Sequence, residues 1–158
     1  MLGNEFEMSF FQGQERLVTM KNLLVAQSGG PSAAINATLA GVVEKAMTNQ
    51  NVGKIYGAKN GIMGILTDKL IDLTETLADP ETLQLLCQTP STALGSGRMK
   101  LSDWEESTFE YDKILGIFRK YDIGYFVYIG GNDSMDTVHK LAGFCERMRI
   151  DDVKIIGA

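Results

Sequence analysis

The sequence is poor in the residues that build disulfide frameworks and metal clusters. Its 158 residues include two cysteines and one histidine. Cys87 and Cys145 lie far apart without CxxC spacing, and His139 has no neighbouring residues that would complete a metal site. These absences exclude a disulfide scaffold and a Cys/His metal cluster, so we expect structural roles for the three side chains.

Positive charge and long apolar runs are also scarce. The formal net charge is -5, which argues against nucleic acid or an acidic membrane surface as a partner. No run approaches the roughly 20 apolar residues that a membrane helix needs. Residues 1–14 lack the basic and apolar regions of a secretory signal. We therefore expect a cytoplasmic protein that binds neither nucleic acid nor membrane.

Glycine is abundant, with 17 residues against three prolines, and glycine pairs mark the ends of predicted strands. Residues 22–26 and 125–129 are apolar runs typical of strands that are buried on both faces of a parallel sheet. Apolar residues at helical spacing follow each run, over 33–47 and 135–148. Residues 153–156 predict one more buried strand.

Two further helices are predicted between these units. Asp79 is a candidate cap for a helix that starts at Pro80 and ends at Thr89-Pro90, and a second helix is expected over 108–120. This alternation predicts an α/β fold with a doubly wound, mostly parallel sheet and helices on both faces. We expect a polar leader over 1–18 and a single domain over 19–158, with ligands at the carboxyl ends of the strands.

The first glycine loop, Ser28-Gly29-Gly30, lies between a predicted strand and a predicted helix. Unpaired N–H groups at a helix amino terminus can hold a phosphate without a lysine. Gly29 and Gly30 are therefore candidate phosphate contacts, although a tight turn would explain the glycines equally well. The loop has neither the GxGxxG dinucleotide pattern nor the GK[ST] ending of a P-loop.

The second loop adds polar side chains to the same arrangement. Gly131 is followed by Asn132, Asp133 and Ser134, which offer an amide, a carboxylate and a hydroxyl where phosphates and a magnesium ion would meet. Simple helix capping by Asp133 or Ser134 is the competing interpretation. A third glycine-rich segment carries Arg98 and Lys100, two cations that could offset phosphoryl charge, so the three segments together favour a polyphosphate site.

Four ordered segments carry a more specific pattern: LLVAQSGGPSAAIN at 23–36, NGIMGIL at 60–66, LGSGR at 94–98 and IGGNDS at 129–134. Together they resemble the phosphofructokinase family, in order its first strand and loop, its NG(x)xGL turn, its next loop and its GGDGS loop. The resemblance covers nearly the whole chain from Asn22 onward. It implies a Rossmann-like lobe that binds the phosphoryl donor.

Members of this family transfer a phosphoryl group to the 1-hydroxyl of fructose 6-phosphate, with magnesium and with ATP or inorganic pyrophosphate as donor. By motif, the resemblance implies that Gly30 contacts the donor phosphate through its backbone and that Arg98 faces the same phosphates. The family has a magnesium-associated aspartate where this sequence has Asn132. An amide brings less charge to a hard cation, which weakens the expected metal contact.

Asp133 bears on the choice of donor. In this family, glycine at that position resembles ATP users and aspartate resembles pyrophosphate users. A carboxylate in the space of the nucleotide's α-phosphate would repel and obstruct ATP while it admits the smaller pyrophosphate. We therefore predict pyrophosphate as the donor, with an ATP-dependent enzyme as the alternative.

The family's catalytic base lies in a TIDND-type segment, which this sequence does not contain. The resemblance thus implies an amino-terminal, donor-binding portion that stops before the catalytic segment and is inactive alone. We expect the full-length enzyme to be a homo-oligomer and the isolated portion to self-associate through an uncovered strand edge and helix face. Asn132 and the missing base leave a non-catalytic anion-binding module as another alternative.

Overall fold

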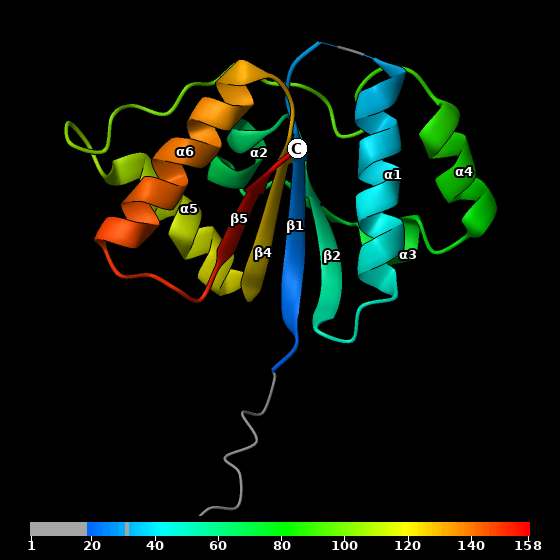
Figure 1. The fold of residues 1–158 in the computed structure, drawn as a ribbon, viewed down its shortest axis with the longest axis horizontal. Helices are drawn as coiled ribbons and strands as arrows, with labels where there is room; N and C mark the ends of the chain where they lie inside the picture. The colour runs from blue at the N-terminus through cyan, green and yellow to red at the C-terminus, as the bar shows by residue number, and fades with distance from the viewer. Residues whose placement is uncertain (1–18, 31) are drawn as a thin grey trace, which may run out of the picture.

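The strand predicted at 22–26 forms β1, Lys21–Gln27, at the centre of a five-stranded sheet. The computed structural model describes residues 19–30 and 32–158. The predicted leader over 1–18 lies outside the described residues. β1 is buried because neighbouring strands flank it on both sides and helices cover both faces (Figure 1).

The sheet has the strand order β3-β2-β1-β4-β5 and is mostly parallel, as predicted. β2, Val52–Ala58, and β4, Ile123–Ile129, both pair in parallel with β1. β5, Lys154–Gly157, pairs in parallel with β4. The short β3, Leu70–Asp72, is antiparallel to β2. Both edges of the sheet are therefore formed by short strands.

Helices cover both faces of the sheet, which confirms the doubly wound architecture (Figure 1). The helices that pack over one face are α1, Ala33–Met47, α3, Leu73–Thr76, and α4, Pro80–Gln88. Those over the other face are α2, Ile62–Leu66, α5, Phe109–Lys120, and α6, Asn132–Arg147. Each face has its own buried cluster, so the sheet separates two hydrophobic layers.

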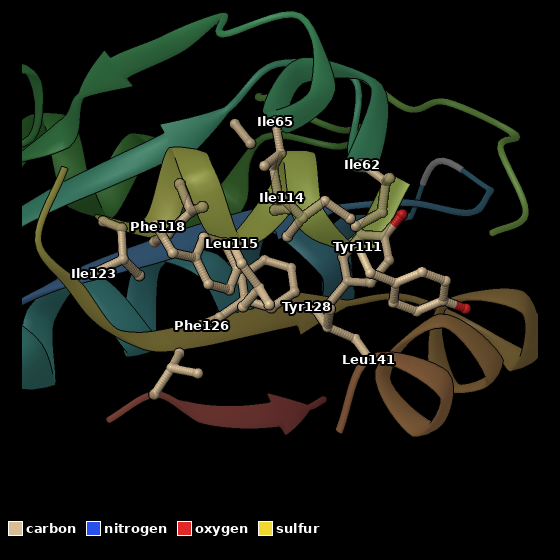
Figure 2. Close-up of a cluster of buried hydrophobic side chains, with 14 of the residues drawn as sticks. Ile62, Ile65, Tyr111, Ile114, Leu115, Phe118, Ile123, Phe126, Tyr128 and Leu141 are labelled. Carbon is tan, nitrogen blue, oxygen red and sulfur yellow. The ribbon is translucent and has the colours of Figure 1, made fainter. Parts of the chain in front are cut away.

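Figure 2 shows the larger cluster, in which α5 lies against β4. Ring centroids of Phe118 and Phe126 are 5.3 Å apart, and those of Phe126 and Tyr128 are 5.8 Å apart. The Tyr111 hydroxyl donates to the carbonyl of Ser102 at 2.7 Å, and burial raises the pKa of Tyr111 to about 12. Aromatic packing and this hydrogen bond hold α5 and the segment before it against the sheet.

Two elements differ from the sequence-based expectation. The apolar stretch at 153–156 predicts a buried strand, but β5 is an edge strand with a single neighbour, and Ile156 is 50% exposed. Met148 is assigned by spacing to the apolar stripe of its helix, yet it follows the last helical residue and is 57% exposed. The apolar character of a segment follows from its own residues, whereas the exposure of its side chains depends on which strands and helices pack against it.

The three side chains expected to be structural also differ from one another. Cys145 is buried in the core, where burial raises the pKa of its thiol to about 11, whereas Cys87 and His139 are exposed. Within residues 19–30 and 32–158, no helix is long and apolar enough to span a bilayer.

Candidate phosphoryl-donor site

The two predicted glycine loops lie side by side because β1 and β4 are neighbours. Gln27 pairs with Ile129 in the parallel register, and the N–H of Ser28 donates to the carbonyl of Ile129 at 2.9 Å. Beyond this point β1 leads to α1 on one face and β4 leads to α6 on the other. The carboxyl ends of β1 and β4 are thus the topological switch point, where sheets of this kind bind ligands.

Glycine allows the two loops to approach each other closely. Gly29 has a φ of +110°, which L side chains rarely adopt, and a Cβ on Gly130 would lie 2.4 Å from the carbonyl oxygen of Ser28. A Cβ on Gly30 or on Gly131 would meet nothing within 4 Å. The fold therefore requires glycine at Gly29 and Gly130, whereas Gly30 and Gly131 face open space that a ligand can fill.

The start of α6 excludes the helix-capping interpretation of the second loop. The residue that caps α6 is Gly131, without a side-chain hydrogen bond, and the helix begins at Asn132. Asp133 and Ser134 therefore already lie in the first turn. Ser134 is 2% exposed and packs beneath Gly130. The carboxylate of Asp133 contacts Lys100 and not the backbone at the start of the helix.

A third loop closes over the first. The hydroxyl of Ser96 donates to the carbonyl of Gly29 at 2.8 Å and accepts from the N–H of Gly29 at 3.1 Å. The hydroxyl of Ser28 donates to the carbonyl of Gly97 at 3.0 Å. These bonds hold the segment with Arg98 and Lys100 beside the glycine loops.

The three loops surround one cleft of about 620 Å³. It brings together every residue that the sequence singles out as a candidate: Gly29, Gly30, Arg98, Lys100, Gly131, Asn132, Asp133 and Ser134. Ser28, Gly97 and Met99 complete the lining. The second and third of these segments in chain order lie about 70 and 100 residues after the first glycine loop, so the sheet topology creates the site.

Charged groups of both signs line the cleft. The Nζ of Lys100 lies 3.0 Å from Oδ1 of Asp133, and this contact raises the pKa of Lys100. Both side chains are more than 65% exposed, so the pair is readily rearranged by an entering anion. Arg98 makes no ion pair with the described residues. Together with the amino terminus of α6, Arg98 supplies positive potential for an anion.

The cleft does not form a metal site from side chains alone. Across the described part of the chain, no group of three or more His, Cys, Asp or Glu residues is placed to hold a metal ion. Asn132 offers an amide, and the Asp133 carboxylate contacts Lys100. Magnesium commonly keeps several waters and binds through one or two carboxylates plus substrate phosphates, so this lining suits a metal that is carried by a polyphosphate.

Sequence reasoning misses three residues that build the site. Ser96 bridges two loops, and Gln27 and Asn36 are fully buried polar residues next to the first loop. A structural role for Gln27 could have been predicted, because an amide at the end of an otherwise apolar buried strand needs hydrogen-bond partners.

Comparison with known proteins relates the chain to one family. A profile described as phosphofructokinase matches residues 22–157. Over 129 residues the chain is 43% identical to a pyrophosphate–fructose 6-phosphate 1-phosphotransferase of Methylococcus capsulatus, with 81% of this chain and 30% of that protein covered. An ATP-dependent 6-phosphofructokinase of Actinobacillus pleuropneumoniae is 32% identical over 118 residues, which are 73% of this chain and 32% of that protein.

Solved structures agree. The pyrophosphate-dependent phosphofructokinase from Nitrosospira multiformis superposes with a TM-score of 0.77 at 39% identity, with 87% of this chain and 33% of that chain covered. The chain thus spans about a third of the length of the relatives it matches.

Proposed function

Because this chain belongs to the phosphofructokinase family, we propose that it is the donor-binding part of an enzyme that phosphorylates fructose 6-phosphate from inorganic pyrophosphate. The product of that reaction is fructose 1,6-bisphosphate. The observation that carries the proposal is the single cleft that gathers the glycine loops, Arg98, Lys100 and Asp133 at the carboxyl ends of β1 and β4. The higher identity to the named pyrophosphate-dependent relative supports the choice of donor.

Backbone groups and cations would bind the pyrophosphate. Gly30 and Gly131 leave the backbone open to the cleft, and the first N–H groups of α6 point out of its amino terminus. Arg98 offers a planar fork of donors that suits phosphate oxygens. An entering pyrophosphate would also draw Lys100 from Asp133, since both side chains are exposed.

Asp133 would select against ATP. Its carboxylate projects from the first turn of α6 into the lining of the cleft. A nucleotide places a third phosphate and a sugar beyond the two phosphates that pyrophosphate has, so one fixed negative charge repels ATP more than pyrophosphate. The ATP-dependent alternative would require the α-phosphate to lie beside this carboxylate.

We propose that magnesium enters as a complex with pyrophosphate. The described residues supply no cluster of carboxylates for a free ion, so donor oxygens and water would make most of its ligands. When bound, the metal would neutralise charge on the transferred phosphoryl group. Asn132 would orient a water or a phosphate oxygen through its amide, in place of a direct carboxylate ligand.

The chain would bind the donor without transferring its phosphoryl group. Its sequence contains no TIDND-type segment to accept the proton of the sugar hydroxyl. Fructose 6-phosphate binding, assembly into an oligomer and a cytoplasmic location remain predictions for the whole enzyme. Asn132 favours the second candidate, an anion-binding module without catalysis, which would bind pyrophosphate similarly with or without magnesium.

The proposal is tested by calorimetric titration of the chain with sodium pyrophosphate, with and without magnesium chloride. We expect saturable binding that magnesium strengthens. Arg98→Met should weaken that binding about tenfold, since a hydrogen bond to a charged group contributes about 1.5 to 3 kcal/mol. Arg119→Met, which removes an arginine far from the cleft, is the matched control. Binding that Arg98→Met leaves unchanged would contradict the assignment.

A further inference from the structure

Two buried carboxamides lie beside the first glycine loop but outside the cleft. Gln27 ends β1 and is 0% exposed, and Asn36 lies in the first turn of α1 and is 1% exposed. The Nε2 of Gln27 donates to Oδ1 of Asn36 at 3.1 Å. Neither residue lines the cleft. We call these two side chains the carboxamide pair.

The carboxamide pair is hydrogen-bonded to the backbone of the segment that follows α4. Oε1 of Gln27 accepts from the N–H of Leu94 at 2.9 Å, and Oδ1 of Asn36 accepts from the N–H of Ala93 at 2.9 Å. The Nδ2 of Asn36 donates to the carbonyl of Thr89 at 2.9 Å. The remaining bond, from Nε2 of Gln27 to the carbonyl of Ile35 at 3.1 Å, ties the pair to α1.

The segment held in this way has no helix or strand of its own between α4 and α5. Its far end is fixed separately, because Leu101 is 2% exposed and its carbonyl accepts from Nζ of Lys140 at 3.1 Å. Arg98 and Lys100 therefore follow a stretch that the carboxamide pair fixes at Ala93 and Leu94 and that Ser28 and Ser96 fix at the first glycine loop, and they precede the anchor at Leu101. A shift of Ala93 and Leu94 would strain the serine contacts that follow and so disturb the placement of both cations.

We propose that Gln27 and Asn36 are positioning residues that hold Arg98 and Lys100 in place for the donor, and this inference rests on the proposed function. Three hydrogen bonds between the carboxamide pair and the backbone would break if the segment shifted, which makes its position discrete. A loop of glycines and exposed cations alone would sample many arrangements and would bind a diphosphate more weakly. The carboxamide pair acts on the donor only through Arg98 and Lys100.

The test uses Gln27→Met, which keeps the size of the side chain and removes its hydrogen bonds. In the ligand-free chain, amide exchange at Ala93 and Leu94 should become about tenfold faster, the change expected when one hydrogen bond is lost. Calorimetry should show pyrophosphate binding about tenfold weaker. Thr74→Val is the matched control, since it removes an acceptor for the N–H of Ile55 far from the cleft and should leave the dissociation constant unchanged.

A double-mutant cycle separates positioning from general destabilisation. If the carboxamide pair acts through Arg98, then Arg98→Met should weaken pyrophosphate binding clearly less in the Gln27→Met background than in the wild-type chain. Asn36→Leu, which keeps the approximate size of the side chain and removes its bonds to Thr89 and Ala93 without adding charge, should show the same non-additivity, and it decides the matter if Gln27→Met does not fold.

Two results would overturn the inference: unchanged exchange at Ala93 and Leu94 in the folded variant, or independent effects of Gln27→Met and Arg98→Met on the dissociation constant. If the wild-type chain binds no pyrophosphate, the proposed function fails. The exchange measurement then still decides whether the carboxamide pair fixes the segment.

Discussion

At the scale of single residues, neighbouring glycines in the cleft have different reasons to be glycine. A Cβ on Gly130 would collide with the backbone of Ser28 at 2.4 Å, whereas a Cβ on Gly131 would meet nothing within 4 Å. Gly131 also has a φ of -88°, which alanine adopts without strain. Packing therefore explains Gly130, whereas no contact with the described residues requires glycine at Gly131.

This difference gives a matched pair of variants. Gly130→Ala should lower the free energy of unfolding by about 1 to 3 kcal/mol, because the added carbon forces backbone atoms apart. Gly131→Ala should change stability by less than about 1 kcal/mol, because the loss of a glycine cap opposes the gain from a stiffer unfolded chain. It should nevertheless weaken pyrophosphate binding several-fold, as its methyl group enters the cleft.

Thermal unfolding and calorimetric titration of the two variants check this pair. If Gly131→Ala bound pyrophosphate as tightly as the wild-type chain, the donor could not lie against the start of α6.

At the scale of elements, α4 is held by its two ends as well as by the partly buried Leu83 and Leu86. None of its residues is fully buried, and the carboxylate of Asp79 accepts from the backbone N–H of Thr82 at 3.0 Å. The carbonyl of Thr89, just after the helix, accepts from Asn36. The position of α4 therefore influences the segment that carries Arg98.

The cap of α4 predicts a pH dependence. Hydrogen bonds from the hydroxyl and the N–H of Thr82 lower the pKa of Asp79 below its usual 3.8. The folded state thus prefers the charged carboxylate, and the cap stabilises fully above pH 3.8 and is lost as pH falls through the lower folded pKa. Asp79→Ala should therefore melt at a lower temperature than the wild-type chain at neutral pH, and the gap should narrow in acid.

Melting curves between neutral pH and about pH 3, near the usual carboxyl range, measure this gap. Asp79→Asn keeps an acceptor that does not titrate in this range, so its gap from Asp79→Ala should stay constant. A wild-type gap that also stays constant would show that the carboxylate does not act as the cap.

At the scale of the whole molecule, the sequence predicted the parallel sheet and the meeting of its loops, because buried strands followed by glycine pairs leave few arrangements. The cap at Asp79 was predicted and is confirmed. Capping of α6 by Asp133 or Ser134, the competing interpretation of the second loop, is excluded because Gly131 is the capping residue and both side chains lie inside the helix. The role of Gln27 and Asn36 was not predictable from periodicity, since the backbone groups that they hold in the segment after α4 lie more than 50 residues away.

The exposure of β5 escaped prediction for a different reason. With Ile155 and Ile156, β5 is apolar enough for a central strand, but it pairs with β4 alone. Burial of such a strand depends on what else lies against it. The edge therefore fits the expected tendency to self-associate, which remains a prediction.

Donor choice depends on a single side chain, Asp133 on α6, and on the cleft that three distant loops build around it. Asp133→Gly removes both the charge and the bulk of the carboxylate, and Asp133→Asn removes the charge alone. We expect Asp133→Gly to strengthen ATP binding about tenfold relative to pyrophosphate, which corresponds to about 1.4 kcal/mol, and Asp133→Asn to have a smaller effect in the same direction.

The most direct measurement is the ratio of the ATP and pyrophosphate dissociation constants, determined with magnesium for the wild-type chain and for Asp133→Gly. A site built for pyrophosphate gives a ratio well above one in the wild-type chain and a lower ratio in the variant. A wild-type chain that binds ATP at least as tightly as pyrophosphate, with a ratio that Asp133→Gly leaves unchanged, would contradict the proposal that Asp133 selects pyrophosphate.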